Sequence, residues 1–187
     1  MKTILLSLLA FILVAGSVPA QTKTVHFKKL QDFLPTATLK GLERKKPTGQ
    51  TQTTMGMTTS EAKVRYVTEQ KQEDQPVPEP EEAVEYVSIE VTISDLSGIP
   101  FGMMTAMAYQ QDFENETEDG YERSVTIKEA YKGKEVVQSG DYKRCELEFI
   151  VGNRFMVKLQ GSATDDLKLL HTLVGSMDLA KLEKTTP

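Results

Sequence analysis

The sequence predicts an α+β domain in which helices flank an antiparallel sheet of about five to six strands. Three observations lead to this expectation. Several short stretches alternate between apolar and polar residues, as half-buried strands do. A glycine–asparagine pair separates the last two of these stretches, as in a hairpin. After them, apolar residues recur at helical spacing toward the C-terminus.

Residues 1–20 have the pattern of a cleavable signal peptide. The basic Lys2 precedes an apolar run over residues 4–15, and small residues stand before the expected cleavage after Ala20. The run is shorter than the ~20 residues that a membrane-spanning helix needs. We therefore expect an exported protein, periplasmic or secreted, with no transmembrane segment after cleavage.

The composition is that of an acidic chain with a formal net charge of −5 and one cysteine, Cys145. Acidic charge opposes binding to a phosphate backbone, so nucleic acid is not an expected partner. A single cysteine allows no disulfide within the chain, so the apolar core must hold the fold. Cys145 alternates with Leu147 and Phe149, which places the thiol on the apolar face of a strand.

After the signal peptide, the chain divides into a polar N-terminal segment, residues 21–60, and an α+β domain, residues 61–187. The polar segment contains a short apolar stretch at residues 30–34, which predicts either one helical turn or a docking segment. The domain opens with two strands, near residues 61–69 and 84–94, in which apolar and polar side chains alternate. We expect these strands to pair in antiparallel fashion.

An extended loop rich in proline and glutamate, residues 71–83, joins these two strands. Alternate prolines and solvated acids favour an extended chain there. A methionine-rich helix is expected near residues 98–113, followed by a solvated acidic loop at residues 114–120. Two more strands then follow, near residues 121–128 and 134–137.

The clearest unit is a hairpin over residues 142–160. A three-residue loop that ends at Asn153 would pair Phe149 with Phe155 and would keep the apolar side chains of both strands on one face. We expect Gly152 or Asn153 to adopt the left-handed backbone conformation in this loop.

The C-terminal residues predict a helix capped by Ser162 or Thr164. Its apolar residues fall at i, i+3, i+4 and i+7, which defines one buried stripe. The stripe consists of Leu170, Leu173, Val174 and Met177. We expect a break at residues 175–176 and a last turn or short second helix at residues 178–182.

Two short runs carry a resemblance to known proteins. The first is Val151-Gly152-Asn153-Arg154-Phe155 and the second is Asp178-Leu179-Ala180-Lys181-Leu182. They resemble a group of exported bacterial proteins in which a "VGNRF" hairpin leads to a C-terminal "DLxKL" helix, and the similarity covers roughly residues 55–183. The resemblance implies a PsbP-like fold, with an antiparallel sheet and flanking helices. It implies no catalytic residues.

These observations favour a non-catalytic binding or accessory protein of the cell envelope. The expected site is a cleft between the methionine-rich helix and the sheet, lined by Met103, Met104 and Met107. An envelope protein or an apolar ligand would dock in this cleft. The sequence contains no glycine-rich phosphate loop, and no cofactor is expected.

Specific residues support two alternative functions. Thioethers select Cu(I), so Met55, Met57, Met103 and Met107 define a copper-binding alternative. Cys145 or His171 defines a hydrolase alternative. The hydrolase is disfavoured because no Gly-x-Ser-x-Gly elbow is present and the cysteine lies on an apolar strand face.

Overall fold

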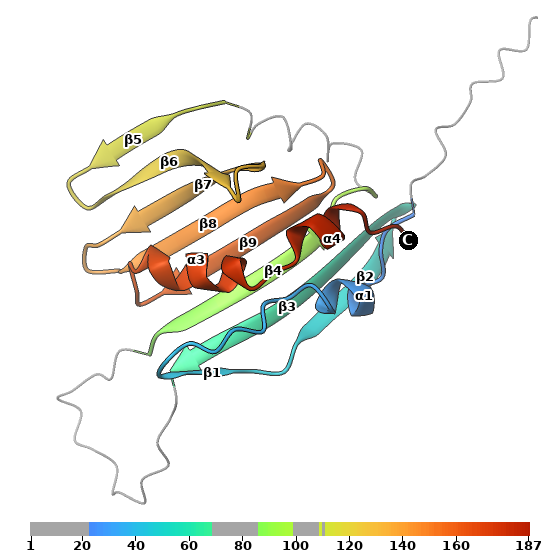
Figure 1. Ribbon diagram of the computed structural model, residues 1–187, viewed down its shortest axis with the longest axis horizontal. Coiled ribbons are helices and arrows are strands. Elements are labelled where there is room, and N and C mark those ends of the chain that lie inside the picture. Colours follow the sequence, from blue (N-terminus) through green and yellow to red (C-terminus); the bar gives the residue numbers. More distant parts are fainter. Residues whose placement is uncertain (1–22, 69–85, 99–108, 110) are drawn as a thin grey trace, which may run out of the picture.

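The computed structural model describes residues 23–68, 86–98, 109 and 111–187. In this part of the chain, nine strands form one antiparallel sheet in the order β1-β3-β4-β9-β8-β7-β6-β5, and β2 also pairs with β3 (Figure 1). The strands are β1 (Leu42–Arg44), β2 (Thr48–Thr54), β3 (Met57–Thr68), β4 (Ser88–Asp95), β5 (Glu114–Thr117), β6 (Gly120–Ile127), β7 (Tyr131–Gln138), β8 (Arg144–Val151) and β9 (Phe155–Ser162). The helices are α1 (Phe27–Gln31), α3 (Leu167–Gly175) and α4 (Leu179–Glu183).

The described helices lie on one face of the sheet, as Figure 1 shows. α3 packs on β8 and β9, α4 packs on β8, and α1 packs on β2 and β3. The predicted stripe of Leu170, Leu173, Val174 and Met177 is buried against the sheet. An antiparallel sheet with flanking helices therefore confirms the predicted α+β class.

The sheet has more strands than the five to six that the sequence predicted. The additional strands are β1, β2 and β5, which lie at the edges of the sheet. Every residue of β5 is exposed, and β2 is exposed along almost all of its length. Alternation between apolar and polar residues marks a strand only when one face is buried, so these edge strands gave no such signal.

The polar segment, residues 21–60, is not separate from the domain predicted at residues 61–187. Its described part supplies α1, β1, β2 and the beginning of β3 to the same sheet. Leu30 of α1 is fully buried, and Phe33 and Leu34 are nearly so. The apolar stretch at residues 30–34 thus belongs to the core, but only its first two residues are in the helix, and the others form the turn that follows it.

The acidic residues expected to form a solvated loop instead form an edge hairpin. β5 pairs with β6, with Glu114 opposite Arg123 and Thr117 opposite Gly120. Ladder hydrogen bonds to β6 hold this strand, so it needs no apolar side chains. Most of the helix predicted over residues 98–113 lies outside the described residues, and residues 111–113 are not helical.

The β3–β4 pair is antiparallel as predicted, with Val64 opposite Val91. Tyr66 and Ile93 lie on the same face of this pair and are fully buried. The predicted signal peptide and the predicted proline–glutamate loop at residues 71–83 lie outside the described residues.

The β8–β9 hairpin has a three-residue loop, but the loop begins one residue later than predicted. Val151 pairs with Phe155, and Phe149 pairs with Val157. This register differs from the predicted one by two residues, so the same side chains remain on the apolar face. Gly152 and Asn153 both have positive φ, at 58° and 53°, which confirms the left-handed turn.

The C-terminal helix begins later than the predicted caps. Ser162 is the last residue of β9, and the Asp166 side chain caps α3 by accepting a hydrogen bond from the Lys168 amide. The predicted break is confirmed, because α3 ends at Gly175. Asp178 then caps α4, which is the short second helix.

Candidate functional site

The face of the sheet opposite the described helices is polar, and it is the far face in Figure 1. Side chains alternate along a strand, so every second residue of the central strands points to this face. We call it the polar face. Its charged and amide residues are Glu61, Lys63, Arg65, Glu90, Glu122, Lys134, Glu146, Glu148, Lys158 and Gln160.

Strand register aligns these residues in two rows that cross the sheet. The rows are Lys63-Thr92-Lys158-Glu148-Lys134 and Arg65-Glu90-Gln160-Glu146-Val136-Glu122. Lys63 Nζ lies 3.0 Å from Glu61 Oε1 and 3.8 Å from Glu90 Oε1. Opposite charges on neighbouring strands therefore pair across the polar face, which stabilises the sheet modestly.

Two shielded carboxylates occupy the centre of the polar face. The side chains of Glu146 and Glu148 are only 9% and 10% exposed, and both approach the ammonium group of Lys158. Lys158 Nζ lies 3.1 Å from Glu146 Oε2 and 3.7 Å from Glu148 Oε2. The Tyr109 hydroxyl donates a hydrogen bond to Glu148 Oε1. These partners compensate the charge of the shielded carboxylates.

Burial and neighbouring charged groups shift the pKa values of three side chains on this face. Burial raises the pKa of Tyr109, and the Glu148 carboxylate raises it further. A hydrogen bond to Glu61 raises the pKa of Lys63. Burial lowers the pKa of Lys134, but the hydrogen bond to Glu122 together with the charges of Glu122, Glu148 and Glu146 outweighs this effect, and the net shift is upward. The lysines thus remain cationic and the tyrosine neutral at physiological pH.

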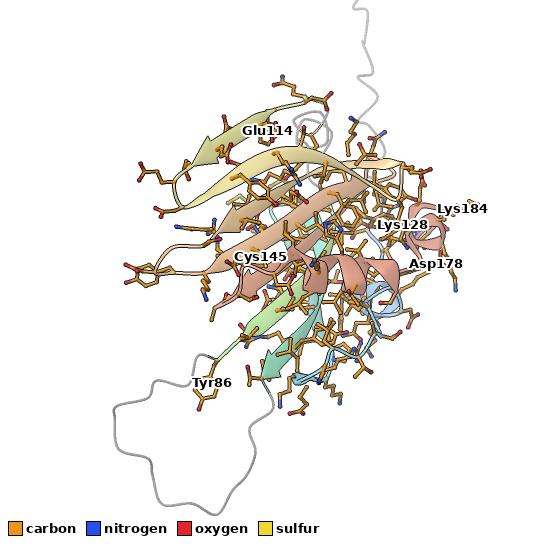
Figure 2. The ribbon with its side chains drawn as sticks, turned by 60° about the vertical axis from the view of Figure 1, so that its left-hand side comes forward. Tyr86, Glu114, Lys128, Cys145, Asp178 and Lys184 are labelled. Atoms are coloured by element: carbon orange, nitrogen blue, oxygen red, sulfur yellow. The ribbon has the colours of Figure 1, made fainter. Side chains whose placement is uncertain are left out.

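A groove opens at the β1 end of the polar face, with a cavity volume of about 750 Å³. Lys45, Arg65, Val67 and Tyr86 are among its lining residues. Tyr86 is 59% exposed and lies just before β4, at one end of the sheet (Figure 2). Arg65 belongs to both the groove and the polar face, so the two form one continuous surface.

The methionines predicted to line a cleft or bind copper are only partly within the described residues. Met103, Met104 and Met107 lie outside them. Met55 and Met57 lie at the β2–β3 turn, where they are 94% and 39% exposed. These two are therefore not core residues, and both the cleft and the copper site stay predictions.

The two residues of the hydrolase alternative have different surroundings. Cys145 is fully buried, and burial raises the pKa of its thiol to about 11. A nucleophilic cysteine needs a lowered pKa, so this environment opposes catalysis by Cys145. His171 is half-exposed on α3, with Nε2 3.5 Å from Glu135 Oε2.

A polar cluster that was not predicted from the sequence surrounds Glu135, on the helix-covered face. This side chain is only 4% exposed, and its Oε1 accepts a hydrogen bond of 2.6 Å from Arg123 Nε. Tyr121 approaches the same oxygen at 3.4 Å, and His171 the other. In the sequence, this cluster was indicated by a glutamate at a position of β7 that lies on the apolar face of the sheet. The cluster links α3 to β7 and β6, which is a structural role.

The described part of the chain contains no group of three or more histidine, cysteine, aspartate or glutamate side chains placed to hold a metal ion. No helix within it has the length and hydropathy needed to cross a membrane.

The chain gives no match in comparisons with known protein families, with characterised proteins and with solved structures. The resemblance to exported bacterial proteins with a PsbP-like fold therefore stays a prediction from the sequence.

Proposed function

We propose that the protein is an exported, non-catalytic binding or accessory protein of the cell envelope, and that it binds a partner protein through the polar face and its groove. The observation that carries this proposal is the exposed ring of Tyr86 in a groove of about 750 Å³. Exposed tyrosines and arginines contribute strongly to binding energy at protein interfaces. Here Tyr86 and Arg65 line the same groove.

The surface chemistry favours binding over catalysis. On the polar face, Glu146 and Glu148 share Lys158, and Glu148 also accepts a hydrogen bond from Tyr109. These contacts engage both carboxylates in ion pairing and hydrogen bonding within the protein. The single thiol, Cys145, lies in the core on the other face with a raised pKa. This arrangement supports a non-catalytic protein.

The kind of partner follows from the charge pattern. The rows of the polar face contain charges of both signs, which suits a protein surface of mixed charge and opposes a phosphate backbone. The groove itself carries charges of both signs, because Lys45 Nζ lies 2.5 Å from Glu43 Oε2 and Arg65 Nε lies 3.9 Å from Glu90 Oε2. This chemistry favours an envelope protein over a purely apolar ligand.

Export is tested by fractionating cells that produce the full chain, and by sequencing the N-terminus of the recovered protein. We expect a processed chain that begins at Gln21, in the envelope or the medium. Deletion of residues 1–20 should retain the protein in the cytoplasm. An unprocessed chain in the cytoplasm of cells that produce the full chain would contradict export.

Binding is tested by quantitative capture of envelope proteins on the immobilised protein, with variants of the groove. Tyr86→Ala and Arg65→Glu should each reduce capture of a specific partner by about tenfold or more. Tyr142→Ala is the matched control, because Tyr142 is 85% exposed and lies outside the groove. Equal capture by all variants would exclude this surface as the binding site.

A specific observation also favours the copper alternative. Met55 and Met57 are exposed, so their thioethers are free of the core packing that usually explains methionine. A Cu(I) titration against a competing chelator would detect this site, and Met55→Leu with Met57→Leu should abolish it. Cu(I) binding that is no tighter than micromolar would exclude a physiological copper site.

A further inference from the structure

The outer edge of β2 is open. β2 pairs with β3 from Thr48 opposite Lys63 to Thr54 opposite Met57, and no described strand pairs with its other edge. A two-residue turn closes this hairpin. Successive residues of β2 therefore direct their backbone N–H and C=O groups alternately toward β3 and toward the open edge. The outward groups belong to Gly49, Thr51 and Thr53.

This edge lacks the features that normally prevent strand pairing. β2 has seven residues, Thr48–Thr54, none of which is charged. Proteins commonly protect edges with charges, prolines or very short strands. The opposite edge of the sheet follows this rule, because β5 has four residues and two of them are Glu114 and Glu116. The β2 edge is therefore the one suited to accept another strand.

The sequence of β2 identifies the strand that fits. Thr-Gly-Gln-Thr-Gln-Thr-Thr is nearly a palindrome about Thr51. Antiparallel pairing of two copies about this residue places Gln50 opposite Gln52, Thr48 opposite Thr54 and Gly49 opposite Thr53. Every position then meets an identical or small polar residue, with no charge repulsion.

We propose that two copies of this chain form a symmetric dimer by antiparallel pairing of their β2 strands, with the twofold axis at Thr51. Thr51 would pair with the same residue of the second copy, and Gly49 with Thr53 on each side. These pairs supply about six backbone hydrogen bonds. The two sheets become one continuous sheet with the helices of both copies on the same side.

Contacts with Phe27 and Ser60 hold β2 in position for this pairing. Phe27 of α1 lies over Gly49, where an added Cβ would come within 2.8 Å of the ring. Thr51 Oγ1 lies 2.7 Å from Ser60 Oγ and accepts a hydrogen bond from the Phe27 amide. These contacts fix β2 to β3 and α1, while most of its residues stay exposed. Pro47, just before β2, limits the pairing at that end.

Sedimentation velocity of the protein purified after expression of the full chain tests this proposal. We expect the wild-type protein to sediment with twice the chain mass over a concentration series. Gln50→Lys with Gln52→Lys opposes like charges across the axis and should give a monomer. Gln50→Lys with Gln52→Glu places each lysine opposite a glutamate and should restore the dimer.

A second pair of variants tests the backbone contacts. Thr53→Pro removes an outward N–H without removing a bond to β3, and it should weaken the dimer at least tenfold. Glu116→Pro makes the same change on the outer edge of β5 and should leave the dimer intact. Circular dichroism shows that each variant is folded. A monomeric wild-type protein, a larger assembly, or a dimer that persists in the double-lysine variant would overturn the proposal.

Discussion

Asp95 and Arg154 form a two-pronged ion pair where β4 meets the β8–β9 turn. Arg154 Nη2 lies 2.7 Å from Asp95 Oδ2, and Nε lies 3.0 Å from Oδ1. The Asp95 side chain is fully buried, and it also accepts hydrogen bonds from the amides of Val25 and Ser97. One carboxylate therefore fastens the N-terminal segment, the end of β4 and the hairpin turn together.

Loss of either partner should destabilise the fold strongly. Asp95→Ala leaves the Arg154 guanidinium and the Val25 amide without their acceptor, and Arg154→Ala leaves a buried carboxylate unpaired. We expect each variant to lower the free energy of unfolding by about 3–5 kcal/mol. Urea denaturation measures this loss, and the double variant should lose less than the sum of the two single losses. A loss below about 1 kcal/mol for Asp95→Ala would show that the pair is unimportant.

The same carboxylate makes stability depend on pH. Burial raises the pKa of Asp95, but Arg154 and the amides of Val25 and Ser97 lower it more, so the pKa lies below its ordinary value. The native carboxyl group thus binds a proton more weakly than the unfolded one. Its stabilisation is complete above the unfolded pKa of about 3.9 and is lost as the pH falls through the lower folded pKa.

Comparison with Asp95→Asn isolates this contribution. The difference in unfolding free energy between wild type and variant should be largest near neutral pH and should shrink in acid below about pH 4. Urea denaturation across this pH range measures the difference. A difference that does not change with pH would mean that Asp95 does not titrate with a lowered pKa.

Lys128 caps the end of α3 from the β6–β7 turn. Its Nζ donates hydrogen bonds to the carbonyl oxygens of Gly175, the last residue of α3, at 3.5 Å and of Met177 at 2.7 Å, and Figure 2 shows it near α4. Lys128→Met should lower the free energy of unfolding by about 0.5–1 kcal/mol, because a cation favours a helix C-terminus. Glu129→Met is the matched control in the same turn and should change stability by less than about 0.5 kcal/mol. Equal effects of the two variants would argue against the cap.

Cys145 should react with thiol reagents only when the protein unfolds. The side chain is fully buried, and its pKa is raised to about 11, so little thiolate exists at neutral pH. Labelling with a chromogenic disulfide in native buffer should therefore be much slower than in denaturant. Rapid labelling of the native protein would favour the hydrolase alternative that the structure opposes.

The sequence was sufficient to predict the central part of the fold. β3, β4 and β9 each bury one face, so their alternation was visible, as was the stripe of α3. β8 is buried on both faces, but its apolar residues still alternate with Glu146 and Glu148. β2 and β5 escaped prediction because neighbouring strands, not apolar side chains, hold them. The hairpin register was off by two residues because alternation fixes only which face is buried. The observed loop, residues 152–154, includes Arg154, whose side chain pairs with Asp95. This contact joins parts of the chain that are far apart in the sequence.

The candidate site was harder to predict than the fold. Arg65 and Tyr86 lie on either side of the segment that joins β3 to β4, and only the register of these strands brings them to one groove. The polar face appeared in the sequence only as the solvent side of each strand. Glu135 was detectable as a charge on an apolar strand face, but its partners Arg123 and His171 come from β6 and α3.

Site-specific photo-crosslinking in living cells tests the proposed binding surface most directly. A benzophenone amino acid would replace Tyr86 in the groove, or Tyr142 as an exposed control outside it. We expect a covalent adduct with an envelope protein from position 86 and none from position 142. No adduct from position 86, or the same adduct from both positions, would contradict the claim that this groove binds the partner.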